Sequence, residues 1–114
     1  MTLAEAMALG KPTIATRYSG NLDFMNDDNS LLVEATMTSL RTRTRSYPRG
    51  ARWAEPSIDD AATKMRWVVD NPAAARQLAE RGRLAIQDSL SLADAGRRMT
   101  KRLAEISESL RFKD

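Results

Sequence analysis

The chain has 114 residues and a net charge of +3; 42% of its residues are hydrophobic and 29% are charged. This composition is typical of a soluble domain with enough apolar side chains for one core. The sequence contains no run of eighteen apolar residues, so we expect no membrane span. The chain has no cysteine and no histidine, which excludes disulfides, thiolate metal sites and an imidazole base. Any chemistry must therefore use carboxylates, hydroxyls, Lys, Arg or backbone amides. Without a signal region, we expect a cytoplasmic protein.

The positive charge is concentrated in one segment. Residues 1–40 carry two basic and five acidic side chains, a net charge of −3. Residues 41–56 carry five arginines and one glutamate, a net charge of +4, and the remainder has eleven basic and nine acidic groups, a net charge of +2. The basic character is therefore a local cluster rather than a property of the whole domain.

The first third of the chain alternates helix and strand signals. Strong helix formers predict a helix over Thr2–Leu9, which Gly10 ends and Pro12 prevents from continuing. Short β-branched runs predict buried strands at 12–16 and 30–33. Between them we expect a loop at 19–21, one helical turn at 22–25 and a polar turn at 26–29.

The rest of the chain divides into an irregular part and a helical part. Residues 34–56 are the least regular, with turn signals at Tyr47–Gly50 and Glu55–Pro56. Ser57 and Ser91 are predicted N-caps, and Pro72 is predicted to begin the helix between them. That middle helix, ending near Asp88, should direct Leu78 and Ile86 inward. The last helix should bury an apolar stripe formed by Leu92, Ala95, Met99, Leu103, Ile106 and Leu110.

Together these elements predict an α/β fold with two short parallel strands, about four helices and a helix-rich C-terminal half. Two strands do not form a stable sheet unaided. Partner strands must then come either from another chain or from residues upstream. We expect one truncated domain over 1–114, divided into a βα region (1–35), an Arg-rich loop (36–56) and a helical segment (57–114).

The order of helix, glycine stop, strand and small-residue loop resembles the retaining glycosyltransferases of family 4. The resemblance rests first on Glu5–Pro12, Ile14–Thr16 and Tyr18–Asn21. It continues, less specifically, through Asn29–Val33, Tyr47–Pro48, Trp53–Pro56 and Met65–Arg66. The resemblance implies a GT-B fold, in which two Rossmann-like domains face a cleft and the C-terminal domain binds a nucleotide-diphosphate sugar. This chain would be the back part of that C-terminal domain.

The GT-B fold also implies a final helix that crosses back to the first domain, a role that fits the apolar stripe of the last helix. Packing of the stripe on this domain's own sheet and self-association through it are the alternatives.

The family motif, two glutamates separated by seven residues, is only half present. Glu5 matches the second glutamate, which in the family hydrogen-bonds the donor's ribose, and Thr2 lies at the edge of the turn that holds the diphosphate. The first glutamate and the phosphate-binding turn are absent from the sequence, as is the N-terminal domain. The resemblance therefore implies a ribose-binding half-site, no assigned catalytic residue, no metal, and a chain that is inactive in transfer by itself.

Each of these assignments has a plain structural alternative. Thr2 and Glu5 have the spacing of a capping box, which the spacing alone favours and the resemblance outweighs. Residues Ser19, Gly20 and Asn21 follow a strand, where α/β proteins bind ligands. They also suit an ordinary turn with glycine at a positive φ, which the sequence alone favours.

The arginine cluster, formed by Arg41, Arg43, Arg45, Arg49 and Arg52, lies near Tyr47 and Trp53. It suggests contact with an anionic membrane surface, a lipid diphosphate or nucleic acid. The plainer interpretation, a solvated loop whose arginines pair with nearby carboxylates, is favoured because no nucleic-acid fold signature accompanies the cluster. If the segment formed a strand, alternation at period two would place three arginines on one face. A non-catalytic interaction domain is thus the alternative function, and a gene fragment without function of its own is a third. The sugar, nucleobase, acceptor and oligomeric state stay open.

Overall fold

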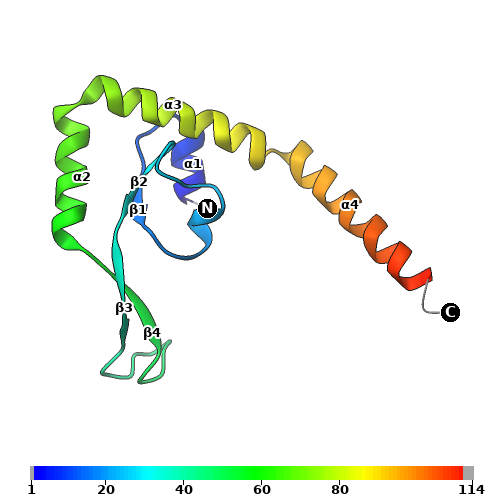
Figure 1. The fold of residues 1–114 in the computed structure, drawn as a ribbon, viewed down its shortest axis with the longest axis horizontal. Coiled ribbons are helices and arrows are strands. Elements are labelled where there is room, and N and C mark those ends of the chain that lie inside the picture. The colour runs from blue at the N-terminus through cyan, green and yellow to red at the C-terminus, as the bar shows by residue number, and fades with distance from the viewer. Residues whose placement is uncertain (1, 112–114) are drawn as a thin grey trace.

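The computed structural model describes residues 2–111 (Figure 1); the ends of the expected domain, residue 1 and residues 112–114, lie outside them. The elements in chain order are α1 (Thr2–Ala8), β1 (Ile14–Thr16), the 3-10 helix η1 (Ser19–Asp23), β2 (Leu31–Val33), β3 (Ala35–Ser39), β4 (Arg52–Pro56), α2 (Ile58–Asp70), α3 (Pro72–Ser89) and α4 (Leu92–Arg111). None of these helices is apolar and long enough to cross a bilayer.

The body of the molecule is a parallel strand pair covered by helices. Strands β1 and β2 pair in parallel, as the sequence predicts, and Ile14 lies opposite Leu31. Helix α1 packs against α3, which crosses the top of the body in Figure 1. Met7 of α1, Met25 and Leu32 are at most 2% exposed and form the centre of the core. The mixed α/β character and the parallel pair are therefore confirmed.

The segment expected to be irregular is in fact a β-hairpin. Strands β3 and β4 pair antiparallel, with Ala35 opposite Pro56 and Ser39 opposite Arg52. The prediction failed because the residues between the strands, 40–51, form a long loop without a tight-turn signature, so that nothing local marks the pairing. The alternating arginines do not share a strand: only Arg52 lies in a strand, and the other four arginines lie in the loop.

The three C-terminal helices begin where the sequence predicts, α2 and α4 after serine caps and α3 at Pro72. Ser57 Oγ accepts a hydrogen bond from Asp60 N at 3.2 Å, and Ser91 Oγ accepts one from Asp94 N at 3.1 Å. In α3, Leu78 and Ile86 are buried as expected. These ends were predictable because a cap is a local interaction.

The α4 stripe is not buried on this domain's own sheet; its packing on a further domain or on a second copy stays a prediction. Leu92 is 94% exposed, Met99 67% and Leu103 66%, because α4 extends away from the body and no described surface covers its apolar side (Figure 1). The radius of gyration, 18.8 Å, exceeds the roughly 13 Å of a compact chain of this length. The hairpin and α4 are therefore two projecting arms on a small body.

Candidate functional site

Helix α1 places Glu5 at the surface beside the parallel strands. Ala4 and Met7 lie on the buried side of α1 and face the core, whereas Glu5 lies on the exposed side. Gly10, with φ of 65°, ends the helix, and its N–H donates to Met7 O at 2.8 Å. Helix α1 begins at Thr2, the residue that a capping box would place at the N-cap, and this alternative for Glu5 stays a prediction.

The turn after β1 has a different geometry from the one expected. Ser19, not Gly20, has a positive φ, at 71°, and a Cβ added to Gly20 would meet nothing within 4 Å. Asn21 Nδ2 donates to Thr16 O at 3.0 Å, which fastens η1 to the end of β1. A non-glycine residue in this region of φ is uncommon, and such residues are often found at ligand sites.

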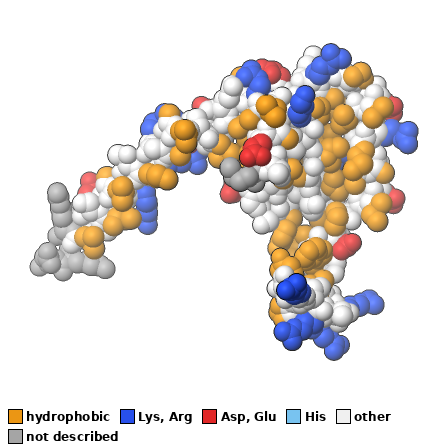
Figure 2. Space-filling view, turned by 180° about the vertical axis from the view of Figure 1, so that it is seen from behind, with side chains coloured by type: hydrophobic (Ala, Val, Ile, Leu, Met, Phe, Trp, Pro, Cys, Tyr) orange, Lys and Arg blue, Asp and Glu red, His pale blue; other side chains and the backbone are white. Residues whose placement is uncertain are grey.

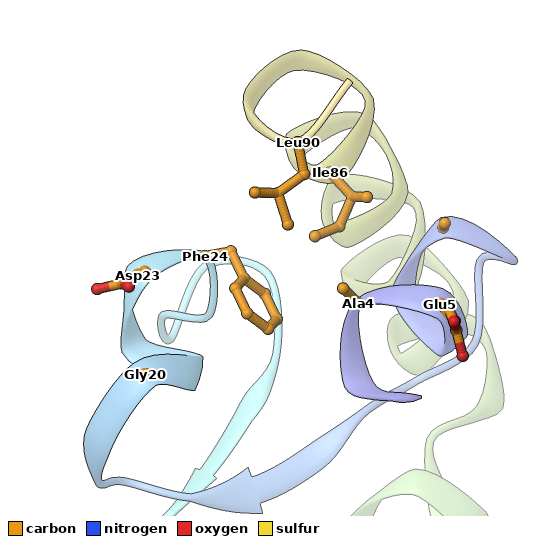
Figure 3. A pocket seen from close by; sticks show the side chains of 8 residues that line it. Ala4, Glu5, Gly20, Asp23, Phe24, Ile86 and Leu90 are labelled. Carbon is orange, nitrogen blue, oxygen red and sulfur yellow. The ribbon is translucent and has the colours of Figure 1, made fainter. Parts of the chain in front are cut away.

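A cavity of about 470 Å³ lies between α1, η1 and α3; we call it the α1–α3 cavity. Glu5 and Gly20, from two separate elements, line opposite sides of it (Figure 3). The full lining is Ala4, Glu5, Ala8, Gly20, Asp23, Phe24, Ile86 and Leu90. Thr2, Ser19 and Asn21 do not line it, so only two of the five residues predicted for a donor site belong to the lining.

Figure 3 shows how the lining side chains are arranged. Phe24, Ile86 and Leu90 point into the opening and give it an apolar wall. The carboxylates of Glu5 and Asp23 point away from its middle, at the rim. The cavity thus presents an apolar surface bordered by two acidic groups, a combination that suits a ligand with one ring face and several hydroxyl groups.

Sequence reasoning missed most of this wall. The inward direction of Ile86 was predicted from helix periodicity, but nothing in the sequence placed α3 against η1. Asp23 and Phe24 fall in the segment expected to be one helical turn, without a sign of their role. Their place in the cavity follows from the packing of α1 on α3, a contact between distant parts of the chain.

An ion-pair group reinforces the carboxyl end of the strand pair. Arg17, just after β1, donates from Nη2 to Asp27 Oδ1 and from Nε to Glu34 Oε1, both at 2.6 Å. The hydrogen bond from Arg17 lowers the pKa of Asp27. The hydrogen bond from Lys64, followed by that from the Glu34 backbone N–H, lowers the pKa of Asp60. These pairs tie β1, β2 and α2 together and hold the base of the hairpin.

Across residues 2–111, no three acidic side chains gather closely enough to coordinate a metal ion.

The arginines of the hairpin are not neutralised by neighbouring carboxylates. All five are exposed, and none forms an ion pair with another residue of the described chain. Figure 2 shows basic side chains gathered at the end of this arm. The expectation that these arginines pair with nearby carboxylates is therefore wrong, and the arm carries unbalanced positive charge.

Comparisons with protein-family models, curated proteins and solved structures found no match to this chain.

Proposed function

We propose that the chain carries part of the donor site of a glycosyltransferase that uses a nucleotide-diphosphate sugar. The observation that carries the proposal is that Glu5 and Gly20 line opposite sides of the α1–α3 cavity (Figure 3). The two residues come from the two parts of the sequence that resemble the family 4 enzymes most. In α/β proteins, the carboxyl ends of parallel strands are the usual place for a ligand, and η1 directly follows that end of β1.

The chemistry of the cavity supports this assignment. The exposed carboxylate of Glu5 can accept hydrogen bonds from two neighbouring ribose hydroxyls, and such charge-assisted bonds are the stronger kind. The apolar wall can pack against a ring of the same ligand. The positive φ of Ser19 beside Gly20 adds the kind of backbone strain often found at binding sites. Thr2, at the start of α1, would lie beside the diphosphate.

The strand pair also favours an association with further strands. On the side that faces β2, Leu31 N donates to Thr13 O at 3.0 Å and Arg17 N donates to Val33 O at 2.8 Å. In a parallel ladder the alternate residues direct their backbone groups to the other side, and β2 is the only described strand that pairs with β1. We propose that this open edge continues into the remaining sheet of a GT-B domain in the intact enzyme.

Transfer itself needs more than this half-site. Donor and acceptor must be held together while charge on the departing phosphate is stabilised. We assign no residue of this chain to those tasks and propose that an N-terminal GT-B domain and upstream residues supply them. The 114-residue chain would then bind nucleotide without transferring sugar.

Equilibrium binding of UDP, GDP and ADP to the purified chain tests the proposal. We expect saturable binding of one of them, at least tenfold weaker in Glu5→Gln. The matched control is Glu55→Gln, which removes the same charge from exposed strand β4 and should leave binding unchanged. Absence of binding by all three nucleotides, or equal effects of the two variants, would count against the donor site.

A second candidate is a non-catalytic domain that binds an anionic membrane surface. The specific observation in its favour is the absence of ion pairs around the five hairpin arginines in the described part of the chain. Binding to vesicles containing phosphatidylserine should weaken steeply as salt rises and should fall when Arg43 and Arg45 are changed to Gln. Arg66→Gln with Arg76→Gln, a charge-matched pair on α2 and α3, is the control. No vesicle binding at low salt would eliminate this candidate, and preference for nucleic acid would replace it.

A further inference from the structure

A second hollow, of about 380 Å³, lies where the hairpin meets the end of β1; we call it the aromatic pocket. It is lined by Thr16, Tyr18, Tyr47, Arg52, Trp53 and Ala54. Tyr18 comes from the connection after β1, Tyr47 from the hairpin loop, and Arg52 and Trp53 from β4. It shares no lining residue with the α1–α3 cavity.

Three of the six aromatic residues of the chain gather at this one hollow. Tyr18, Tyr47 and Trp53 are 47%, 49% and 40% exposed. The rings of Tyr47 and Trp53 meet edge to face, with centroids 5.6 Å apart and planes at 81°. An edge-to-face contact holds the two rings in place while leaving a ring face open. Exposed apolar side chains that gather in one patch mark binding sites, whereas single exposed ones are ordinary.

The polar groups of the pocket limit what it can bind. Thr16, Tyr18 and Tyr47 each contribute a hydroxyl group, which can both donate and accept a hydrogen bond. Arg52 is the only charged residue of the lining, and it has no ion-pair partner among residues 2–111. A free guanidinium favours an anionic group, above all a phosphate or carboxylate. A ligand that suits the pocket therefore combines a ring, several hydroxyls and one anionic group.

We propose that the aromatic pocket binds a sugar phosphate, with the sugar ring against the aromatic side chains and the phosphate at Arg52. The volume of the hollow lies within the usual range for small-ligand sites, about 300–1,000 Å³. A sugar meets the three hydroxyls with hydroxyls of its own, whereas a nucleobase offers fewer such groups. The inference concerns a site distinct from the donor half-site and holds whether or not the proposed transferase function is correct.

The indole N–H signal of Trp53 gives a local measurement of binding. The chain has two tryptophans, so the ¹⁵N spectrum should show two indole signals. The variant Trp67→Phe assigns them by removing one signal. If that variant does not fold, Trp53→Phe serves the same purpose. The probe is glucose 6-phosphate, titrated beside glucose, inorganic phosphate and AMP. We expect a saturable shift of the Trp53 signal with glucose 6-phosphate, and at least tenfold weaker binding of glucose and of phosphate alone.

A pair of charge-matched variants separates a built site from general attraction to a basic arm. Arg52→Gln should weaken glucose 6-phosphate binding at least tenfold, whereas Arg41→Gln, outside the lining of the pocket, should leave it within twofold. Equal losses of affinity in both variants would overturn the proposal. So would an affinity for inorganic phosphate equal to that for glucose 6-phosphate. Tighter binding of AMP at Trp53 would also overturn it, in favour of a nucleobase site. Failure here would leave the nucleotide test at Glu5 unaffected, because that test uses other residues and other ligands.

Discussion

The body and the two arms of this molecule use similar residues in opposite ways. Met7 in α1 is 1% exposed and lies in the core, whereas Met99 in α4 is 67% exposed. Gly82 in α3 is closed in by its neighbours, whereas Gly96 in α4 has open space around it. The packing of α1 on α3 positions Glu5, shapes the α1–α3 cavity and contributes Met7 and Ile86 to the core. The hairpin and α4 instead leave most of their side chains exposed.

The largest expected difference is between the two methionines. Met7→Ala should lower the free energy of unfolding by about 2–5 kcal/mol, because it leaves a cavity in the core. Met99→Ala should change it by no more than about 0.5 kcal/mol, because the side chain is already in water. Urea unfolding followed by circular dichroism measures both. Similar losses would show that α4 packs on the body after all.

The two glycines give a comparison with opposite signs. A Cβ at Gly82 would lie 2.9 Å from Asn29 O and 3.1 Å from Met7 Cε. Gly82→Ala should therefore cost roughly 1–3 kcal/mol by overpacking. Gly96→Ala meets nothing within 4 Å and should favour helix α4 by up to about 1 kcal/mol. Thermal unfolding and helix content test the pair, and a stabilising Gly82→Ala would contradict the close packing described above.

Two asparagines test whether the turn before β2 belongs to the body. Asn29 is buried, accepts from Asn26 N at 2.8 Å and donates to Phe24 O at 3.0 Å. Asn29→Ala should cost about 1–3 kcal/mol, because it removes the hydrogen-bond partner of the Asn26 N–H and of the Phe24 carbonyl, both partly buried. Asn71→Ala removes an exposed side chain that donates to Trp67 O and should cost less. Comparable values would mean that the turn contributes no more than the surface does.

The smallest effect expected is an acid-dependent loss of stability. Arg17 lowers the pKa of Asp27, Lys64 lowers that of Asp60, and Arg83 lowers that of Glu80, each chiefly through a hydrogen bond. A carboxylate whose folded pKa is depressed stabilises the fold above its unfolded pKa, and this stabilisation is lost as the pH falls through the folded value. The free energy of unfolding should therefore fall as the pH drops below about 4. Arg17→Gln should flatten this dependence, and an unchanged pH profile would argue against the Arg17 ion pairs.

Local signals predicted the framework of this fold well. Gly10, Ser57 and Ser91 marked helix ends because caps and stops act within a few residues. The hairpin was missed because its register joins Ala35 to Pro56 across a long loop. The α4 stripe was predicted to be buried because periodicity shows which side of a helix is apolar, and not whether a surface exists to cover it.

The candidate site was only partly accessible from the sequence. The resemblance singled out Glu5 and Gly20, which both line the α1–α3 cavity. Phe24 and Leu90 could not be predicted, since their place depends on the tertiary packing of η1 and α3. The expected glycine at positive φ was wrong because Ser19 adopts that conformation.

The most direct test of the central claim is an amide NMR titration of the 114-residue chain with UDP, GDP and ADP. If Glu5 and Gly20 form one donor half-site, a single nucleotide should shift the signals of both residues with the same saturation curve, and Glu5→Ala should abolish the shift at Gly20. A well-dispersed spectrum in which saturating nucleotide moves neither residue, or moves only the hairpin, would contradict it.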